Sequence, residues 1–210
     1  MKSISTLGLP NSLLGATLLL ALTQNGWAFS SGSKKCEIQF DPSAVKVEWT
    51  AYKTTAKVPV SGTFKEVKIQ GASQGADVKS ILSGASVEIT GNTIDSGNAG
   101  RDQNIREAFL SHLAKQASFG GKFSDVKESS FTLQMDFNGM TRAVPMTYAL
   151  KEGQFVATGG FDLLDFKATQ AFDGIHERCK ELHKGADGVS KTWSEIALKV
   201  SAPYSETCRN

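Results

Sequence analysis

Residues 131–150 read F-T-L-Q-M-D-F-N-G-M-T-R-A-V-P-M-T-Y-A-L, and this stretch is the strongest indication of the fold class. Apolar side chains take every second position of its first half, at Phe131, Leu133, Met135 and Phe137. The alternation resumes behind Asn138-Gly139, at Val144, Met146, Tyr148 and Leu150. Such alternation places one face of a strand on an apolar interior, and Asn-Gly is a favoured hairpin turn. The stretch therefore predicts two antiparallel strands with one shared buried face.

The same period of two recurs on both sides of this hairpin. Alternating runs cover residues 45–52, 63–69, 85–90, 119–123, 155–163 and 196–200. Short turns such as Glu152-Gly153 join several of them, which favours antiparallel connections. Together the runs predict about eight strands, which can pack as a sandwich or close into a barrel. A barrel of about eight strands is wide enough to hold one small ligand.

Two segments with a helical period interrupt the strands. Residues 101–115 carry one apolar stripe, formed by Ile105, Phe109, Leu110 and Leu113. Residues 169–183 carry another, formed by Phe172, Ile175, Cys179 and Leu182. A stripe at this spacing is typical of a helix that packs one face against the rest of the protein. We therefore expect two helical insertions in an otherwise all-β domain.

The first residues have the pattern of a secretory signal peptide. Lys2 precedes an apolar run over residues 13–23, which is shorter than the about 20 residues that a membrane span needs. Small residues at Gly26 and Ala28 favour cleavage after Ala28, with cleavage after Ser30 and an uncleaved anchor as alternatives. The expected organisation is a signal peptide over residues 1–28, a flexible segment over 29–36 and one domain over 37–210. We therefore expect a periplasmic or secreted protein whose mature chain has no transmembrane segment.

The charge balance argues against a nucleic-acid partner. The chain has 23 Lys and Arg against 21 Asp and Glu, for a net charge of +2. A protein that binds nucleic acid or an anionic lipid surface usually has a clear excess of basic residues. We therefore expect no nucleic-acid partner, and the sequence leaves a homodimer open.

Three cysteines, Cys36, Cys179 and Cys208, are expected to form one disulfide in an oxidising compartment. The D-P-S-A turn after Phe40 can reverse the chain and carry Cys36 toward the junction of the second helix and the last strand. We therefore favour Cys36–Cys179, with Cys208 free. Cys36–Cys208 is the alternative, because the first and last strands of a closed barrel adjoin.

Motifs for catalysis are missing from the sequence. It contains no G-x-S-x-G, no H-E-x-x-H and no phosphate-binding glycine loop, so we expect neither enzymatic activity nor a cofactor. His176, Cys179 and His183 share one helix face at a spacing that could bind zinc or copper. We favour a disulfide-bonded cysteine and solvated histidines there, and hence no metal site.

A corner rich in turn residues lies over residues 93–105, T-I-D-S-G-N-A-G-R-D-Q-N-I, between an alternating run and the first helix. Arg101 can organise this corner through an ion pair with Asp95, which is the interpretation we favour. Alternatively, the guanidinium group contacts a ligand headgroup at the mouth of a barrel.

Five segments, in this order, resemble the YceI-like family of lipocalin-like, polyisoprenoid-binding proteins. They are F-D-P-S-A-V-K-V-E-W, S-G-T-F-K-E-V, I-D-S-G-N-A-G-R-D, F-N-G-M-T-R-A-V-P-M and G-G-F-D-L-L-D-F. The resemblance implies an antiparallel barrel with an apolar pocket for a long-chain isoprenoid or a similar amphiphilic lipid. It also places Arg101 and Asp102 at the mouth of that pocket. Three positions depart from the family pattern, since Asn104 replaces a histidine, the D-P-S-A-V turn lacks another, and L-L-D-F replaces R-S-D-F.

The alternation predicts about eight antiparallel strands with two helical insertions. The family resemblance implies that they form a single lipocalin-like β-barrel. Its expected ligand is an isoprenoid, quinone or fatty-amide-type lipid. The alternatives are a filled-barrel stress or interaction module and a metal-binding protein that uses the second helix. We expect these residues to line the pocket: Trp49, Phe64, Phe119, Phe123, Phe131, Leu133, Met135, Val144, Met146, Tyr148 and Phe161.

Overall fold

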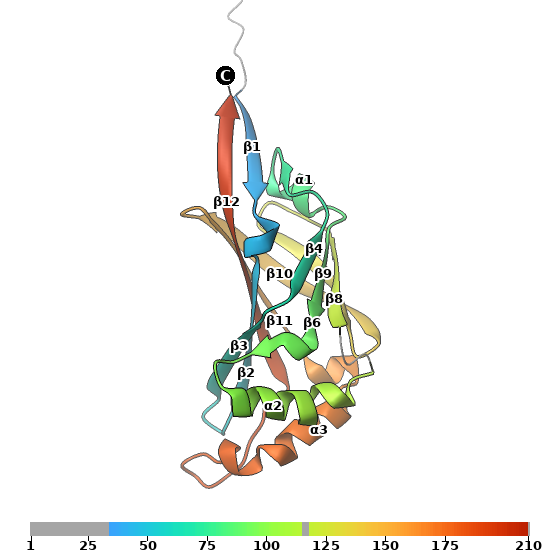
Figure 1. Ribbon diagram of the computed structural model, residues 1–210, viewed down its shortest axis with the longest axis vertical. Coiled ribbons are helices and arrows are strands. Elements are labelled where there is room, and N and C mark those ends of the chain that lie inside the picture. The colour runs from blue at the N-terminus through green and yellow to red at the C-terminus, as the bar shows by residue number, and fades with distance from the viewer. Residues whose placement is uncertain (1–33, 115–117, 210) are drawn as a thin grey trace, which may run out of the picture. The chain divides into compact units, whose positions relative to one another are not determined.

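One antiparallel sheet dominates the computed structural model, which describes residues 34–114 and 118–209 (Figure 1). The expected signal peptide lies outside these residues, and so does most of the expected flexible segment. The strands are β1 (Lys35–Phe40), β2 (Lys46–Lys53), β3 (Val58–Phe64), β4 (Val67–Gln70), β5 (Gln74–Gly75), β6 (Ser86–Thr90), β7 (Ile94–Asp95), β8 (Ser118–Ser124), β9 (Ser130–Phe137), β10 (Met140–Lys151), β11 (Gln154–Asp162) and β12 (Glu195–Arg209).

The helices are α1 (Val78–Leu82), α2 (Ala99–Ala108) and α3 (Thr169–Arg178). Short 3₁₀ turns lie between the larger elements, at η1 (Pro42–Ala44), η2 (Gly91–Thr93), η3 (Leu110–His112), η4 (Leu163–Phe166) and η5 (Lys180–His183). In the described part of the chain, no helix is long and apolar enough to cross a membrane.

The hairpin that the sequence predicts over residues 131–150 is formed by β9 and β10. Phe137 pairs with Met140, and Leu133 pairs with Val144 farther along the ladder. Asn138 and Gly139 make the turn with positive φ angles of 50° and 74°. Two consecutive residues with positive φ are what a tight type I′ hairpin requires, which explains the Asn-Gly pair.

The sheet curls into a lipocalin-like barrel in the order β4-β6-β8-β9-β10-β11-β12-β2-β3-β7. Although β3 and β4 lie near opposite ends of this order, only residues 65–66 separate them in the chain. Two backbone hydrogen bonds hold this bend in place. Lys65 N donates to Thr93 O, and Thr90 N donates to Glu66 O. The predicted barrel is thereby confirmed, and the sandwich alternative is wrong.

The described residues form twelve strands where the sequence predicted about eight. The single run predicted over residues 63–69 is divided between β3 and β4 by the bend. The strands β5 and β7 have two residues each, too few to show a period. The segment predicted to be flexible includes Lys35 and Cys36, which belong to β1.

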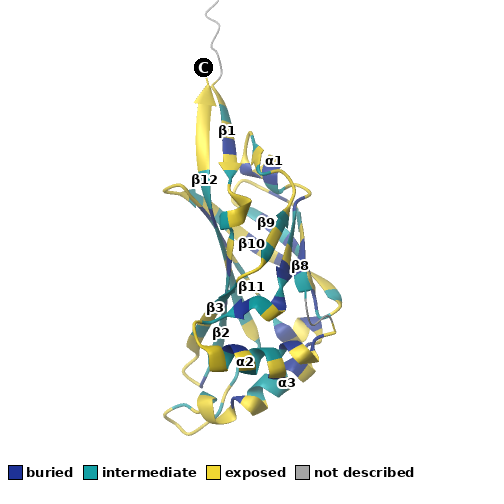
Figure 2. Ribbon diagram, viewed as in Figure 1, coloured by how far each residue is buried: buried dark blue, intermediate teal, exposed yellow. Residues whose placement is uncertain are grey.

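Apolar side chains of the inward face form the core, whereas the outward face is exposed (Figure 2). Phe137 of β9 lies at the centre of an aromatic group near one end of the barrel. Its ring centroid is 5.6 Å from Phe119, 5.5 Å from Phe161 and 5.6 Å from Phe166. These contacts attach η4 to the sheet and so place the start of α3.

Both predicted helical insertions are present, and each ends in a 3₁₀ turn. The helix α2 begins behind Asn98, whose Oδ1 accepts a hydrogen bond of 2.9 Å from Arg101 N. The helices α2 and α3 lie side by side at one end of the barrel (Figure 1), which we call the helical end. A glycine permits this approach, because a Cβ atom at Gly174 would lie 2.4 Å from Ala108 O.

The favoured disulfide, Cys36–Cys179, is wrong, and the alternative is the one that forms. Cys36 of β1 lies opposite Cys208 of β12, their Cα atoms are 4.0 Å apart, and their sulfur atoms are bonded. The D-P-S-A turn does not carry Cys36 to α3, because β1 pairs along the last part of β12. Cys179 is a free, buried cysteine at the end of α3.

Candidate functional site

A cavity of about 790 Å³ lies inside the barrel and continues between the sheet and the two larger helices. Interiors of proteins are normally packed so closely that few voids exceed one water molecule. A cavity of this size instead falls within the range of about 300–1,000 Å³ that is usual for small-molecule sites. The barrel is hollow, contrary to the filled-barrel alternative.

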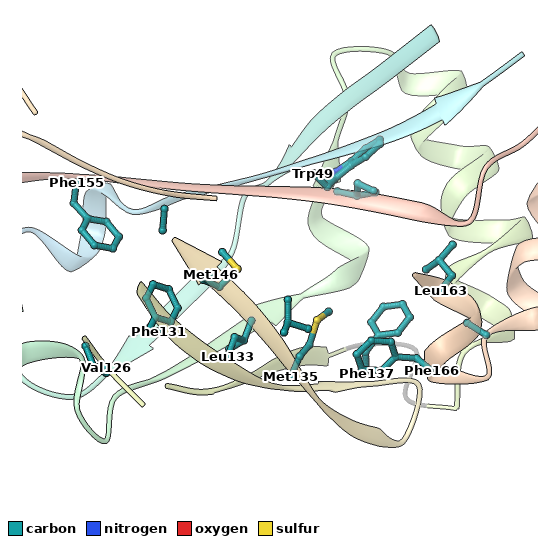
Figure 3. Close-up of a cluster of buried hydrophobic side chains, with 14 of the residues drawn as sticks. Trp49, Val126, Phe131, Leu133, Met135, Phe137, Met146, Phe155, Leu163 and Phe166 are labelled. Atoms are coloured by element: carbon teal, nitrogen blue, oxygen red, sulfur yellow. The ribbon is translucent and has the colours of Figure 1, made fainter. Parts of the chain in front are cut away.

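Most of the residues predicted to line a pocket do line this cavity: Trp49, Phe64, Phe119, Phe123, Phe131, Leu133, Met135, Met146 and Phe161. Figure 3 shows the side chains of Phe131, Leu133 and Met135 extending from β9 toward the interior that Trp49 enters from β2. Each of these side chains belongs to the inward parity of its strand, as the alternation predicted.

Val144 and Tyr148 are the two exceptions, although both lie on the inward parity of β10. Val144 is buried in the core, with 2% of its surface exposed. The ring of Tyr148 packs against Phe155, with 5.4 Å between the centroids. Its hydroxyl group donates a hydrogen bond of 2.7 Å to Lys127 O. Parity therefore identifies the buried face but does not separate cavity lining from packed core.

The helices contribute lining residues that the sequence did not assign to the pocket. The cavity is bordered by Ile105 of α2, by Phe109 directly after that helix, and by Phe172 and Ile175 of α3. Their apolar stripes were visible, but a stripe does not say whether it packs against a sheet or faces a void. Further lining comes from Phe40, Phe155, Ile196, Leu198 and Val200 on strands.

The corner before α2 is organised differently from the favoured prediction. Asp95 pairs with Lys65 at 3.1 Å, and no ion pair joins it to Arg101. A backbone hydrogen bond from Gly97, followed by the Lys65 ammonium group, lowers the pKa of Asp95. Asp102 is buried, and its Oδ1 accepts hydrogen bonds from Ser96 N at 2.9 Å and Ser96 Oγ at 2.6 Å. Asp102 therefore holds the corner together and does not line the cavity, whereas Arg101 does.

Two residues of the metal-binding alternative, His176 and His183, contact the same threonine. His176 Nδ1 is 2.9 Å and His183 Nδ1 is 2.7 Å from Thr192 Oγ1. In the described ranges, the ligand atoms of His176, Cys179 and His183 do not gather within 4.8 Å of one another. Burial raises the pKa of the Cys179 thiol, which disfavours the thiolate that a metal would need. The metal-binding alternative thus lacks a preformed three-ligand site.

Comparison with protein families gives one match, to a model described as a YceI-like domain, over residues 38–202. No curated protein matches the sequence. Among solved structures, BcnA of Burkholderia cenocepacia is 15% identical with a TM-score of 0.51, over 79% of this chain and 99% of that one. A polyisoprenoid-binding domain from Saccharophagus degradans, implicated in plant cell wall breakdown, is 11% identical with a TM-score of 0.53, over 80% and 97% of the two chains. At these identities the two structures establish the shared fold alone.

Proposed function

Because the chain belongs to the YceI-like family, we propose that it binds a long-chain isoprenoid or a similar amphiphilic lipid inside its barrel. The observation that carries the proposal is the apolar cavity of about 790 Å³. Burying a tail there would contribute about 0.8 kcal/mol for each methylene group. The polyisoprenoid-binding neighbour from Saccharophagus degradans supports the same ligand class. Quinones and fatty amides carry tails of the same kind.

The lining suits a flexible tail better than a rigid ligand. Met135 and Met146 border the cavity together with several phenylalanines, and methionine side chains adapt to irregular shapes at low cost. The protein acts, in this proposal, as a carrier or store and not as an enzyme.

The proposed location is the periplasm or the cell exterior. The sequence pattern of residues 1–28 supports export, and a disulfide between Cys36 and Cys208 suits an oxidising compartment. In this setting, a protein that shields an insoluble tail from water could move a lipid between membranes.

Native mass spectrometry of freshly purified mature protein tests the proposal. We expect a mass adduct that organic solvent extracts as a long-chain lipid. After removal of the lipid, titration with a polyprenol should change the fluorescence of Trp49 and Trp193, which both line the cavity. A protein that carries no lipid and gives no saturable change with any long-chain amphiphile would refute the proposal.

A further inference from the structure

The charged residues that line the cavity all have the same sign. Lys53, Arg101 and Arg178 border it, and no aspartate or glutamate of the described residues does. Composition does not explain this, because the chain has nearly as many acidic as basic residues. We propose that the helical end of the cavity binds an anionic headgroup, a carboxylate or a phosphate, of the lipid whose tail fills the barrel. This inference rests on the proposed function and restricts the expected ligands to lipids with an anionic headgroup.

The two arginines lie on neighbouring helices, and Arg178 contacts an asparagine of the helix that carries Arg101. Arg101 is on the first turn of α2, and Asn104 follows three residues later on the same face. Arg178, the last residue of α3, donates from Nη1 to Asn104 Oδ1 at 3.2 Å. All three residues border the same cavity, and the helices that carry them, α2 and α3, lie side by side (Figure 1).

Unlike Arg178, Arg101 has a guanidinium group that is not engaged with another side chain of the described residues. It is half-buried, and its side chain has no hydrogen bond or ion pair with any other described residue. Removing a charge partly from water without giving it a partner raises the free energy of the unliganded protein. An anion that pairs with Arg101 would offset this desolvation penalty. The planar fork of arginine also matches the two oxygens of a carboxylate or phosphate.

Lys53 brings a third positive charge from β2. Its Nζ donates to Leu182 O at 3.4 Å, next to the end of α3. Its proximity is also evident at His183, where burial, followed by the charge of Lys53, lowers the pKa of the ring. No carboxylate of the described chain pairs with Lys53.

Two acidic residues near this end, Glu107 and Asp187, are engaged outside the cavity. Glu107 pairs with Arg178 at 3.1 Å, but both side chains are about half exposed, at 47% and 44%. An exposed pair of this kind is weak and leaves Arg178 free to turn to a second anion. Asp187 accepts a hydrogen bond of 2.6 Å from Thr55 Oγ1.

Apolar surface begins directly beyond these charges. Ile105 follows Arg101 on α2, Phe109 caps the end of that helix, and Ile175 precedes Arg178 on α3. A headgroup held between the arginines would therefore direct its tail into the barrel toward Trp49.

Matched amphiphiles test the headgroup independently of the tail. Delipidated mature protein would be titrated with a long-chain fatty acid, the alcohol of the same chain, an alkyl phosphate of that chain and inorganic phosphate, with tryptophan fluorescence or calorimetry as the readout. We expect the acid and the alkyl phosphate to bind at least about tenfold more tightly than the alcohol, with a preference that falls in high salt. The tighter of the two anionic lipids identifies the headgroup.

Single substitutions show which residues cause the preference for anionic lipids over the alcohol. Arg101→Gln, Arg178→Gln and Lys53→Gln should each bring the affinity for the anionic lipid closer to that for the alcohol. Lys122→Gln, at an exposed position of β8 outside the cavity, should retain the preference.

The outcomes separate this inference from the proposed function. Equal affinities for acid, alkyl phosphate and alcohol overturn the anionic headgroup and leave lipid binding intact. Inorganic phosphate that binds as tightly as the alkyl phosphate overturns the lipid headgroup in favour of a free-anion site. Failure of every amphiphile to bind overturns both proposals.

Discussion

At the scale of single residues, Arg101 and Asp102 are neighbours in sequence with opposite environments. Asp102 is buried and binds Ser96, whereas Arg101 borders the cavity. We expect Arg101→Ala to change the free energy of unfolding by no more than about 0.5 kcal/mol while it weakens binding of an anionic lipid. Asp102→Ala should instead cost about 1–3 kcal/mol, because it removes a buried carboxylate and leaves two partly buried donors of Ser96 without their acceptor. Urea denaturation beside lipid titration measures both effects, and a large loss of stability in Arg101→Ala alone would assign that residue a structural role.

His183 makes folding sensitive to acid. Burial, with the charges of Lys53 and His176, lowers its pKa below the ordinary value of 6.5. As the pH falls through 6.5, the unfolded chain takes up a proton that the folded ring still refuses. This contribution to stability is therefore present above that pH and declines below it. Urea denaturation between about pH 8 and about pH 5 should show the decline, and His183→Gln should flatten it. His112→Gln, at an exposed position, is the control that should leave the decline unchanged.

At the scale of elements, the disulfide determines how firmly β1 is held. Among the described strands, β1 pairs only with β12 and the two-residue β5, and its bridge closes a loop between residues 172 positions apart. Replacement of both Cys36 and Cys208 by serine should lower the free energy of unfolding by about 2–5 kcal/mol. Cys179→Ser should have a much smaller effect, because this cysteine forms no bridge. Denaturation curves of the two variants give the comparison, and non-reducing peptide mapping that linked Cys179 to either partner would contradict the assignment.

The elements that could be predicted are those long enough to show a period. The strand β9 alternates over eight residues, and its partner β10 follows a turn with a specific Asn-Gly signature. In contrast, α1 has only five residues and is defined by a capping box between Asp77 and Ser80. Such a short helix depends on local hydrogen bonds that periodicity does not detect. That the first and last strands adjoin, as β1 and β12 do, was expected only as the basis of the alternative disulfide, because a contact between opposite ends of the chain leaves no local period in the sequence.

At the scale of the whole molecule, the sequence predicted which side chains are buried but not which of them border the cavity. Alternation identified which side chains face inward, yet it could not separate Met146, which borders the cavity, from Val144, which is packed core. Net charge was misleading in a similar way. A total of +2 gave no sign of an anionic partner, whereas the fold places Lys53, Arg101 and Arg178 around one cavity. Both failures arise because a cavity is defined by elements distant in sequence.

A hollow barrel should tolerate changes that a filled core would not. Met135 is almost fully buried and borders the cavity, as does its neighbour Leu133. An arginine in a filled core would leave an unpaired buried charge, which costs several kcal/mol and unfolds most domains. In a cavity, the long side chain can instead extend its charged end toward solvent. Met135→Arg should therefore fold but lose lipid binding, and Leu133→Trp should do the same by occupying the space of the tail.

Circular dichroism and the amount of lipid extracted per folded molecule separate these possibilities. Ala149→Arg is the matched control, because Ala149 is exposed on the outward parity of β10 and should preserve both fold and lipid. If Met135→Arg and Leu133→Trp both unfold while the control folds, the interior of the protein in solution does not accept extra volume. If the wild type then also yields no lipid, the barrel is collapsed in solution and the carrier function fails with it. Folded, lipid-free variants beside a lipid-loaded control are what a tail-binding cavity requires.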